Sequence, residues 1–105
     1  MKGYVELTGY EGLYEINRSG IVRNNKGDVL SPFTNQDGYL RLTLFKEGRK
    51  RNFYIHRLVA KQFIPNPNKY KEIDHIDRNR KNNSIINLRW ISRIGNCDNR
   101  GKRTS

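Results

Sequence analysis

The sequence has little cysteine and little histidine. Cys97 is the single cysteine, so no disulfide can form within the chain. The two histidines are His56 and His75, and together with Cys97 they are too few to complete a tetrahedral zinc site of Cys and His ligands. An internal disulfide framework and a zinc cage of this type are both excluded.

Apolar residues are also scarce. They make up 34% of the 105 residues, and no run approaches the roughly 20 apolar residues that a membrane-spanning helix needs. Residues 1–4 lack the apolar run of a signal peptide. We therefore expect a small, reduced, intracellular (cytoplasmic) protein with room for one domain and no membrane contact.

Acidic side chains are few relative to basic ones. The chain has 21 Lys and Arg residues against 10 Asp and Glu residues, a formal net charge of +11. Residues 1–40 carry four basic and five acidic residues, whereas residues 41–105 carry seventeen basic and five acidic ones. Such an asymmetry predicts a polyanionic partner, and nucleic acid is favoured over a basic surface that serves only solubility.

Turn residues and short alternating patterns predict antiparallel strands in the first half. The clearest strand covers residues 39–45, where three leucines alternate with Arg41 and Thr43. Arg41 could face DNA or water, and the pattern does not choose between them. The expected strands lie at residues 13–17, 21–24, 29–30, 39–45 and 52–55.

The period of the apolar residues becomes helical at residue 55. Ile55, Leu58, Val59, Gln62 and Phe63 share one helical arc, and Pro65 predicts the end of the helix at residue 64. The remaining pattern predicts a strand, a polar loop, a returning strand and a last helix, at residues 72–77, 78–84, 87–91 and 92–99. The expected fold class is α+β.

Four polar residues of this second half could form a reactive centre. Asp74 and His75 are adjacent at the end of a predicted strand, Asn87 begins the returning strand, and Asn96 lies one turn inside the last helix. Asp74 and the Asn96 side-chain oxygen suit a hard divalent cation, and neutral His75 could take a proton from an attacking water. Asn87 could hold the loop or orient the imidazole. Strict strand alternation would separate Asp74 from His75, so the strand must bend or end there.

The ordered series of residues resembles the phage HNH homing-type endonucleases, in their His-Asn-Asn variant with a ββα-metal nuclease core. The residues that carry the resemblance are Ile55-His56-Arg57-Leu58-Val59-Ala60, Phe63-Ile64-Pro65-Asn66-Pro67, Asp74-His75-Ile76-Asp77, Asn82-Asn83, Asn87-Leu88-Arg89-Trp90 and Asn96. The upstream residues 9–16 and 37–39 resemble the nuclease-associated module that commonly precedes this core. The resemblance implies a β-rich module at residues 1–54 packed with a nuclease core and basic tail at residues 55–105, together one domain.

The resemblance also implies the role of each residue. His75 would be the general base, Asp74 and Asn96 the ligands of one Mg²⁺ or Mn²⁺ ion, and Asn87 the residue that constrains the active-site loop. The implied activity is hydrolysis of double-stranded DNA, with nicking of one strand, by a monomer encoded by a phage and acting in a bacterial host.

Other polar and aromatic residues have simpler interpretations. We expect His56 to be structural, Asp77 to cap a turn, Asn79, Asn82 and Asn83 to form turns, and Trp90 and Phe63 to belong to the core. Basic residues are predicted to contact DNA at Arg49, Lys50, Arg51, Arg78, Arg80, Lys81, Arg89, Arg93 and Arg100.

Two other functions stay open at this point. A basic nucleic-acid-binding module with a catalytically silent pocket would share the charge pattern, and a nuclease for RNA or single strands would share the reactive residues. Pure binding does not require the set formed by Asp74, His75 and Asn96, which favours the nuclease.

Overall fold

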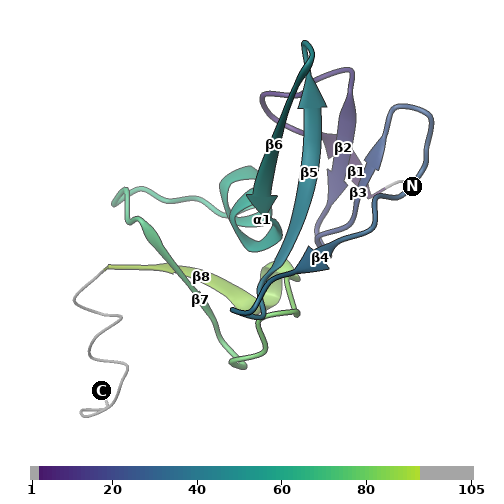
Figure 1. Cartoon of the computed structure of the whole chain (residues 1–105). Helices are drawn as coiled ribbons and strands as arrows, with labels where there is room; N and C mark the ends of the chain where they lie inside the picture. Colours follow the sequence, from purple (N-terminus) through teal and green to yellow (C-terminus); the bar gives the residue numbers. More distant parts are fainter. Residues whose placement is uncertain (1–2, 93–105) are drawn as a thin grey trace, which may run out of the picture.

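The computed structural model describes residues 3–92, in which three small antiparallel sheets surround one helix (Figure 1). The first sheet has the order β1-β2-β3 and the second has the order β4-β5-β6, while β7 and β8 form a two-stranded third sheet. The elements are β1 (Tyr4–Glu6), β2 (Tyr14–Asn17), β3 (Val22–Asn24), β4 (Phe33–Thr34), β5 (Leu40–Lys46), β6 (Arg49–Tyr54), α1 (Ile55–Phe63), β7 (Glu72–His75), the 3₁₀ helix η1 (Ile85–Asn87) and β8 (Leu88–Ile91).

The predicted α+β class and most predicted strands are confirmed; the strand predicted at residues 29–30 is wrong, because Val29 forms only an isolated bridge with Arg23. The sequence pattern missed β1 and β4, which have three and two residues and are too short to show an alternating pattern. It also placed the end of β7 two residues too late, because the strand ends at His75 and Arg78 N–H closes a turn onto the His75 carbonyl at 2.8 Å. The predicted helix at residues 92–99 lies almost entirely outside the described residues.

One hydrophobic core joins the sheets to the helix. Alternation places Ile16 of β2 and Leu42 and Leu44 of β5 inward, where they are almost fully buried. Val59 of α1 and Leu88 of β8 complete the contact between the sheets and the helix. Burial of these apolar side chains is the main stabilising contribution in so small a protein.

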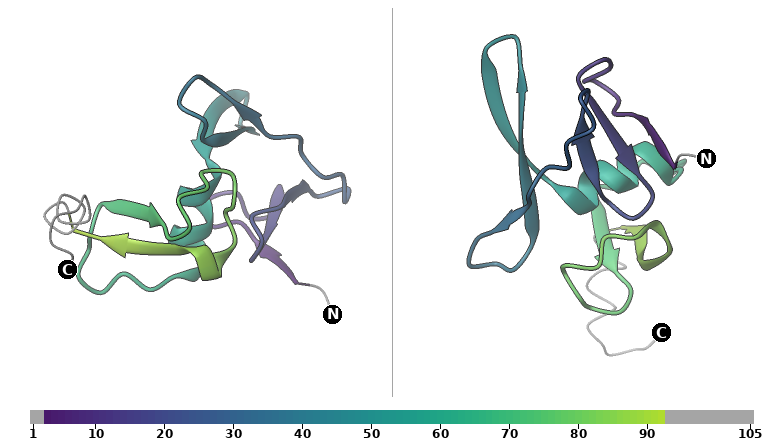
Figure 2. Two further views of the ribbon diagram at one scale, coloured as in Figure 1. Left: turned by 90° about the horizontal axis from the view of Figure 1, so that it is seen from below. Right: turned by 90° about the vertical axis from the view of Figure 1, so that its right-hand side faces the viewer.

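Helix α1 contacts β5 and β6 of the second sheet as well as β7, η1 and β8. Figure 2 shows it running between the first sheet and the β7–β8 pair. It follows β6 directly, and Pro65 prevents its continuation. Its buried residues include His56 and Ala60, whereas Gln62, which the apolar arc placed inward, accepts a hydrogen bond from Thr8 N–H and ties α1 to the end of β1. No helix among residues 3–92 combines the length and apolar character that crossing a membrane requires.

Candidate functional site

His75 is the last residue of β7 and its imidazole points into the protein. The side chain is 6% exposed, and its Nε2 lies 2.8 Å from Oδ1 of Asn83. The aromatic rings of Tyr39 and His56 lie against it, with ring centroids 5.8 and 4.9 Å away. The imidazole is thus held both at one nitrogen and by ring contacts.

Asp74 pairs with Arg89 on the neighbouring strand. The two residues are register partners in the β7–β8 ladder, and Arg89 donates from Nε and Nη2 to Asp74 Oδ2 at 3.0 and 2.9 Å. This pair links the end of β7 to β8 beside His75. The strand ends at His75, as the sequence interpretation required, with Asp74 half-buried and His75 buried.

Asn87 holds the loop that follows β7. The residue is 6% exposed, and its side chain donates to Asp77 Oδ1 and to the Asn82 carbonyl, both at 2.9 Å, while its Oδ1 accepts from Asp77 N–H at 2.9 Å. All hydrogen-bonding atoms of the buried amide are therefore used inside the loop. Of the two roles left open by the sequence, this geometry corresponds to loop constraint.

Asp77 closes the same loop from the opposite side. Its carboxylate accepts hydrogen bonds from Asn79 N–H at 2.8 Å and from the Asn82 side chain at 2.9 Å. These bonds, with the Asn82 contribution largest, hold the pKa of Asp77 below its ordinary value. The contacts agree with the expected turn cap.

Asn83 is the site residue that the sequence interpretation missed. It was expected to form a turn, but it is 4% exposed and its side-chain oxygen contacts the His75 ring. The turn at Gly20 packs closely against Asn83, since a Cβ added at Gly20 would lie 3.2 Å from the Asn83 Cβ. The sequence feature that could have indicated this role is the pair Asn82-Asn83. In the structure the Asn82 side chain bonds to the loop residue Asp77, and the Asn83 side chain bonds to His75.

His56 is buried beside His75 and stays uncharged. Burial, followed by the nearby His75 and Arg57, lowers the pKa of His56 from 6.5 to about 4. Its Nδ1 is the one buried side-chain nitrogen or oxygen within residues 3–92 that has no hydrogen-bond partner. Its burial against the core matches the expected structural role.

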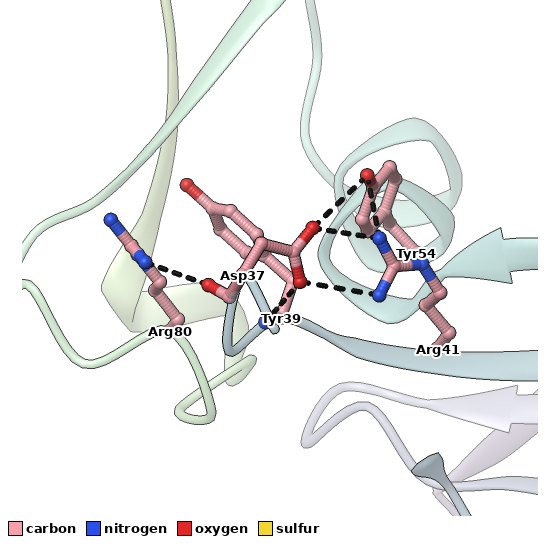
Figure 3. A network of polar contacts seen from close by, with 5 residues as sticks. All are labelled: Asp37, Tyr39, Arg41, Tyr54 and Arg80. Carbon is pink, nitrogen blue, oxygen red and sulfur yellow. Dashed lines mark hydrogen bonds and ion pairs between the residues drawn. The ribbon is translucent and has the colours of Figure 1, made fainter. Parts of the chain in front are cut away.

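Arg41 is mostly buried and is held by neighbouring side chains. It forms an ion pair with Asp37 at 2.7 Å and donates to the Tyr54 hydroxyl at 2.9 Å (Figure 3). Hydrogen bonds to the Asp37 carboxylate, of which the one from Arg41 has the largest effect, hold the pKa of Asp37 below its ordinary value. Arg41 is thus engaged within the protein at the start of β5.

The predicted DNA-contacting residues fall into four groups. Arg49, Lys50 and Arg51 are exposed at the start of β6, and Arg78 and Lys81 are exposed in the loop after β7. Arg80 donates to the Asp37 carbonyl at 2.7 Å, and Arg89 is paired with Asp74. Arg93 and Arg100 lie outside the described residues.

Of the two predicted metal ligands, Asp74 is the one that lies among the described residues. Among residues 3–92 no group of three or more His, Cys, Asp and Glu side chains could hold a metal ion. The Asp74 carboxylate is of the oxygen type that Mg²⁺ and Mn²⁺ prefer, as is the side-chain oxygen of an asparagine. The second predicted ligand, Asn96, lies outside the described residues, so the ligand pair remains a prediction.

Fold and site together define a small α+β protein with a histidine centre beside exposed basic side chains, as expected of an enzyme that acts on nucleic acid. Residues 53–96 match the model of the HNH endonuclease family. The chain is 38% identical over 99 residues to the DNA endonuclease I-HmuI of Bacillus phage SP01, covering 93% of this chain and 57% of that protein. It is 36% identical over 85 residues to the H-N-H endonuclease F-TflI of Escherichia phage T5, covering 71% of this chain and 44% of that protein.

A solved structure described as DNA binding and cleavage by the HNH homing endonuclease I-HmuI has the same fold. Its TM-score is 0.84 at 38% identity, and the match covers 95% of this chain and 57% of that one. The similarity to the HNH endonuclease family lies in residues 53–96. The chain spans about half the length of the two phage endonucleases, at 57% and 44%.

Proposed function

We propose that this chain is a metal-dependent endonuclease that hydrolyses phosphodiester bonds of double-stranded DNA, nicking one strand, with His75 as the general base. The observation that carries the proposal is the fixed His75 imidazole, bonded to Asn83 at the end of β7 inside the HNH segment. A DNA-binding domain without chemistry has no need for a histidine held in one orientation.

The contact with Asn83 selects the ring nitrogen that takes the proton. The side-chain oxygen of Asn83 can only accept, so His75 Nε2 carries the hydrogen in this contact. The lone pair is then on Nδ1, which we assign to remove the proton from the attacking water. Asn83 thereby sets both the tautomer and the direction of the base.

Asn87 acts on the reaction through the loop. Its hydrogen bonds to Asp77 and Asn82 fix the segment that carries Asn83. Asn87 therefore keeps the partner of His75 in place without contacting the reacting atoms, which is a positioning role.

Asp74 and Asn96 would hold one divalent ion, Mg²⁺ or Mn²⁺. When bound, such an ion stabilises negative charge on the phosphate and on the departing 3′ oxygen. Arg89 keeps the Asp74 carboxylate oriented from the neighbouring strand through its contacts with Oδ2.

The exposed basic residues would contact the DNA backbone. Arg49, Lys50 and Arg51 form one group and Arg78 and Lys81 another, both exposed to solvent. Phosphate contacts of this kind orient a protein on the duplex without reading its sequence. The active form is proposed to be a monomer in a phage-infected bacterial cell.

A nicking assay on supercoiled plasmid tests this function. Full-length protein with Mg²⁺ or Mn²⁺ should convert supercoiled DNA to nicked circles, and a chelator should stop the conversion. Single-stranded DNA and RNA of the same sequence, assayed in parallel, should be cut more slowly. An uncut plasmid with either metal would favour the silent binding module, and faster cutting of RNA or single strands would favour the other nuclease class.

A further inference from the structure

The Asp37-Gly38-Tyr39 turn lies where the second sheet meets the loop after β7 (Figure 3). Its own hydrogen bonds define its shape: Gly38 N–H donates to the Asn35 carbonyl and Tyr39 N–H to Asp37 Oδ1, both at 3.1 Å. Gly38 has a φ of +80°, which favours glycine over residues with a side chain. None of its three residues is among the proposed metal ligands or the proposed DNA contacts.

Two sets of contacts fix the turn on opposite sides. On the sheet side, Arg41 donates from Nη1 and Nη2 to the two Asp37 carboxylate oxygens, at 3.2 and 2.7 Å. On the loop side, Arg80 donates to the Asp37 carbonyl at 2.7 Å, and its guanidinium lies 4.9 Å from the centre of the Tyr39 ring. The turn therefore joins β5 to the loop that follows His75.

The Tyr39 ring extends from this turn into the histidine centre. It lies 5.8 Å from the His75 ring at an interplanar angle of 37°, and 5.1 Å from the His56 ring at 39°. His56 meets His75 edge-on at 4.9 Å and 64°. The His75 imidazole thus has Asn83 at one nitrogen and two aromatic neighbours that restrict rotation of the ring.

We propose that Tyr39 is a positioning residue for His75, and that the Asp37–Tyr39 turn transmits the placement of the β5–β6 hairpin to the catalytic histidine. The inference rests on the proposed role of His75 as the base. Loss of the Tyr39 ring leaves a gap on one side of the imidazole, and Nδ1 is then aimed at the water in only part of the molecules. A misplacement of this kind slows the chemical step rather than DNA binding.

Two substitutions separate the aromatic ring from the hydroxyl. Tyr39→Leu removes the ring, and we expect the single-turnover nicking rate at saturating protein to fall about tenfold to a hundredfold, as for a small displacement of a reacting group. Its affinity for plasmid DNA should change less than about twofold. Tyr39→Phe keeps the ring and should nick at close to the wild-type rate.

The imidazole signals of His75 give a readout that does not depend on activity. With ¹⁵N-labelled histidine, multiple-bond NMR spectra distinguish the two tautomers, and wild type and Tyr39→Phe should show one defined form with hydrogen on Nε2. Tyr39→Leu should shift these signals towards an average of both forms.

A second tyrosine provides the matched control. Tyr4 of β1 is also partly buried and also lies under an arginine, with the Arg23 guanidinium 3.8 Å from its ring centre, but it belongs to the first sheet. Tyr4→Leu should lower stability while leaving both the nicking rate of the folded protein and the His75 signals unchanged.

The outcomes distinguish this inference from the proposed function. If His75→Ala nicks at the wild-type rate, the base assignment fails, and the inference fails with it. If His75→Ala is inactive while Tyr39→Leu keeps either full activity or unshifted His75 signals, the inference alone is overturned. Slow nicking together with shifted signals in Tyr39→Leu, and neither change in Tyr39→Phe, supports it.

Discussion

Among single residues, Asn83 determines most directly how the proposed base is presented. Its oxygen lies 2.8 Å from His75 Nε2, and both side chains are buried. Asn83→Ala removes the acceptor and should lower the nicking rate about tenfold or more, because the imidazole loses its defined tautomer. Asn83→Asp retains an acceptor and should recover most of the lost rate.

Nicking rates of the two Asn83 variants at saturating protein check this prediction. Asn79→Ala, in an exposed part of the same loop, is the control and should cleave normally. Equal rates for Asn83→Ala and wild type would mean that the contact does not orient the base.

His56 predicts a pH dependence of stability. The pKa of His56 is about 4 in the folded protein and 6.5 without burial. Between pH 6.5 and pH 4, the His56 side chain is therefore protonated in the unfolded chain but neutral in the folded protein. The free energy of unfolding should therefore fall by up to about 3 kcal/mol as the pH decreases from 6.5 to 4, and His56 should have no such effect above pH 6.5.

Urea denaturation across this pH range measures the effect. His56→Gln, which cannot titrate there, should show a flatter profile than wild type, and the difference between the two proteins isolates the contribution of His56. Parallel profiles would show that His56 is not held neutral by the fold.

For single residues, the sequence was most informative where a residue type has few possible roles, as for histidine. His75 was selected because a histidine follows a carboxylate, and the loop-constraining role of Asn87 was among its stated options. It could not separate Asn83 from Asn79 and Asn82, because turn formation and ring contact use the same amide group. Only the fold, which buries Asn83 against His75, tells them apart.

At the scale of elements, the turn between β2 and β3 packs against the loop that follows β7. Gly20 has a φ of +88°, and a Cβ there would lie 3.2 Å from both the Asn83 Cβ and the Ile55 Cγ2. Gly20→Ala should therefore cost stability through backbone strain, about 1–2 kcal/mol, and should also displace Asn83 and slow nicking.

Gly27 offers a matched control for this substitution. Its φ is also +88°, but a Cβ there would meet nothing within 4 Å. Gly27→Ala should carry the same backbone strain with normal nicking by the folded protein. If the two variants nick equally fast under conditions where both are folded, the Gly20 turn does not act on the site.

Two things limited the prediction of strands from the sequence: how long each strand is and which strand it pairs with. The strand of residues 39–45 was found because its leucines alternate over seven residues, close to the observed Leu40–Lys46. β1 and β4 are too short for such a pattern and depend on pairing with the next strand, such as Val5 opposite Ile16 and Phe33 opposite Arg41. Arg41 was ambiguous for a different reason: its partner Asp37 is only four residues away, but the turn that brings the two side chains together is visible only in the fold.

For the molecule as a whole, the charge predicts salt-dependent DNA binding. If about six basic residues neutralise phosphates, the logarithm of the affinity should fall with the logarithm of salt concentration at a slope near −5. Replacing Arg49, Lys50 and Arg51 together by alanine should make this slope less steep by about 3. Filter binding or fluorescence anisotropy at several salt concentrations measures both slopes.

The Arg41→Ala variant is a control for the hairpin substitution, because Arg41 is engaged with Asp37 and Tyr54. Its slope should match that of the wild type. An unchanged slope in the triple variant would place the DNA contacts elsewhere on the protein.

The central claim is that His75 performs the chemistry and that DNA binding does not depend on it. Single-turnover nicking of plasmid DNA by His75→Ala and by wild type, with affinity and salt slope measured on the same preparations, tests this most directly. The predicted result is a loss of nicking of at least about a hundredfold, with an affinity within about twofold of wild type and the same salt slope. Nicking by His75→Ala at the wild-type rate would contradict the account.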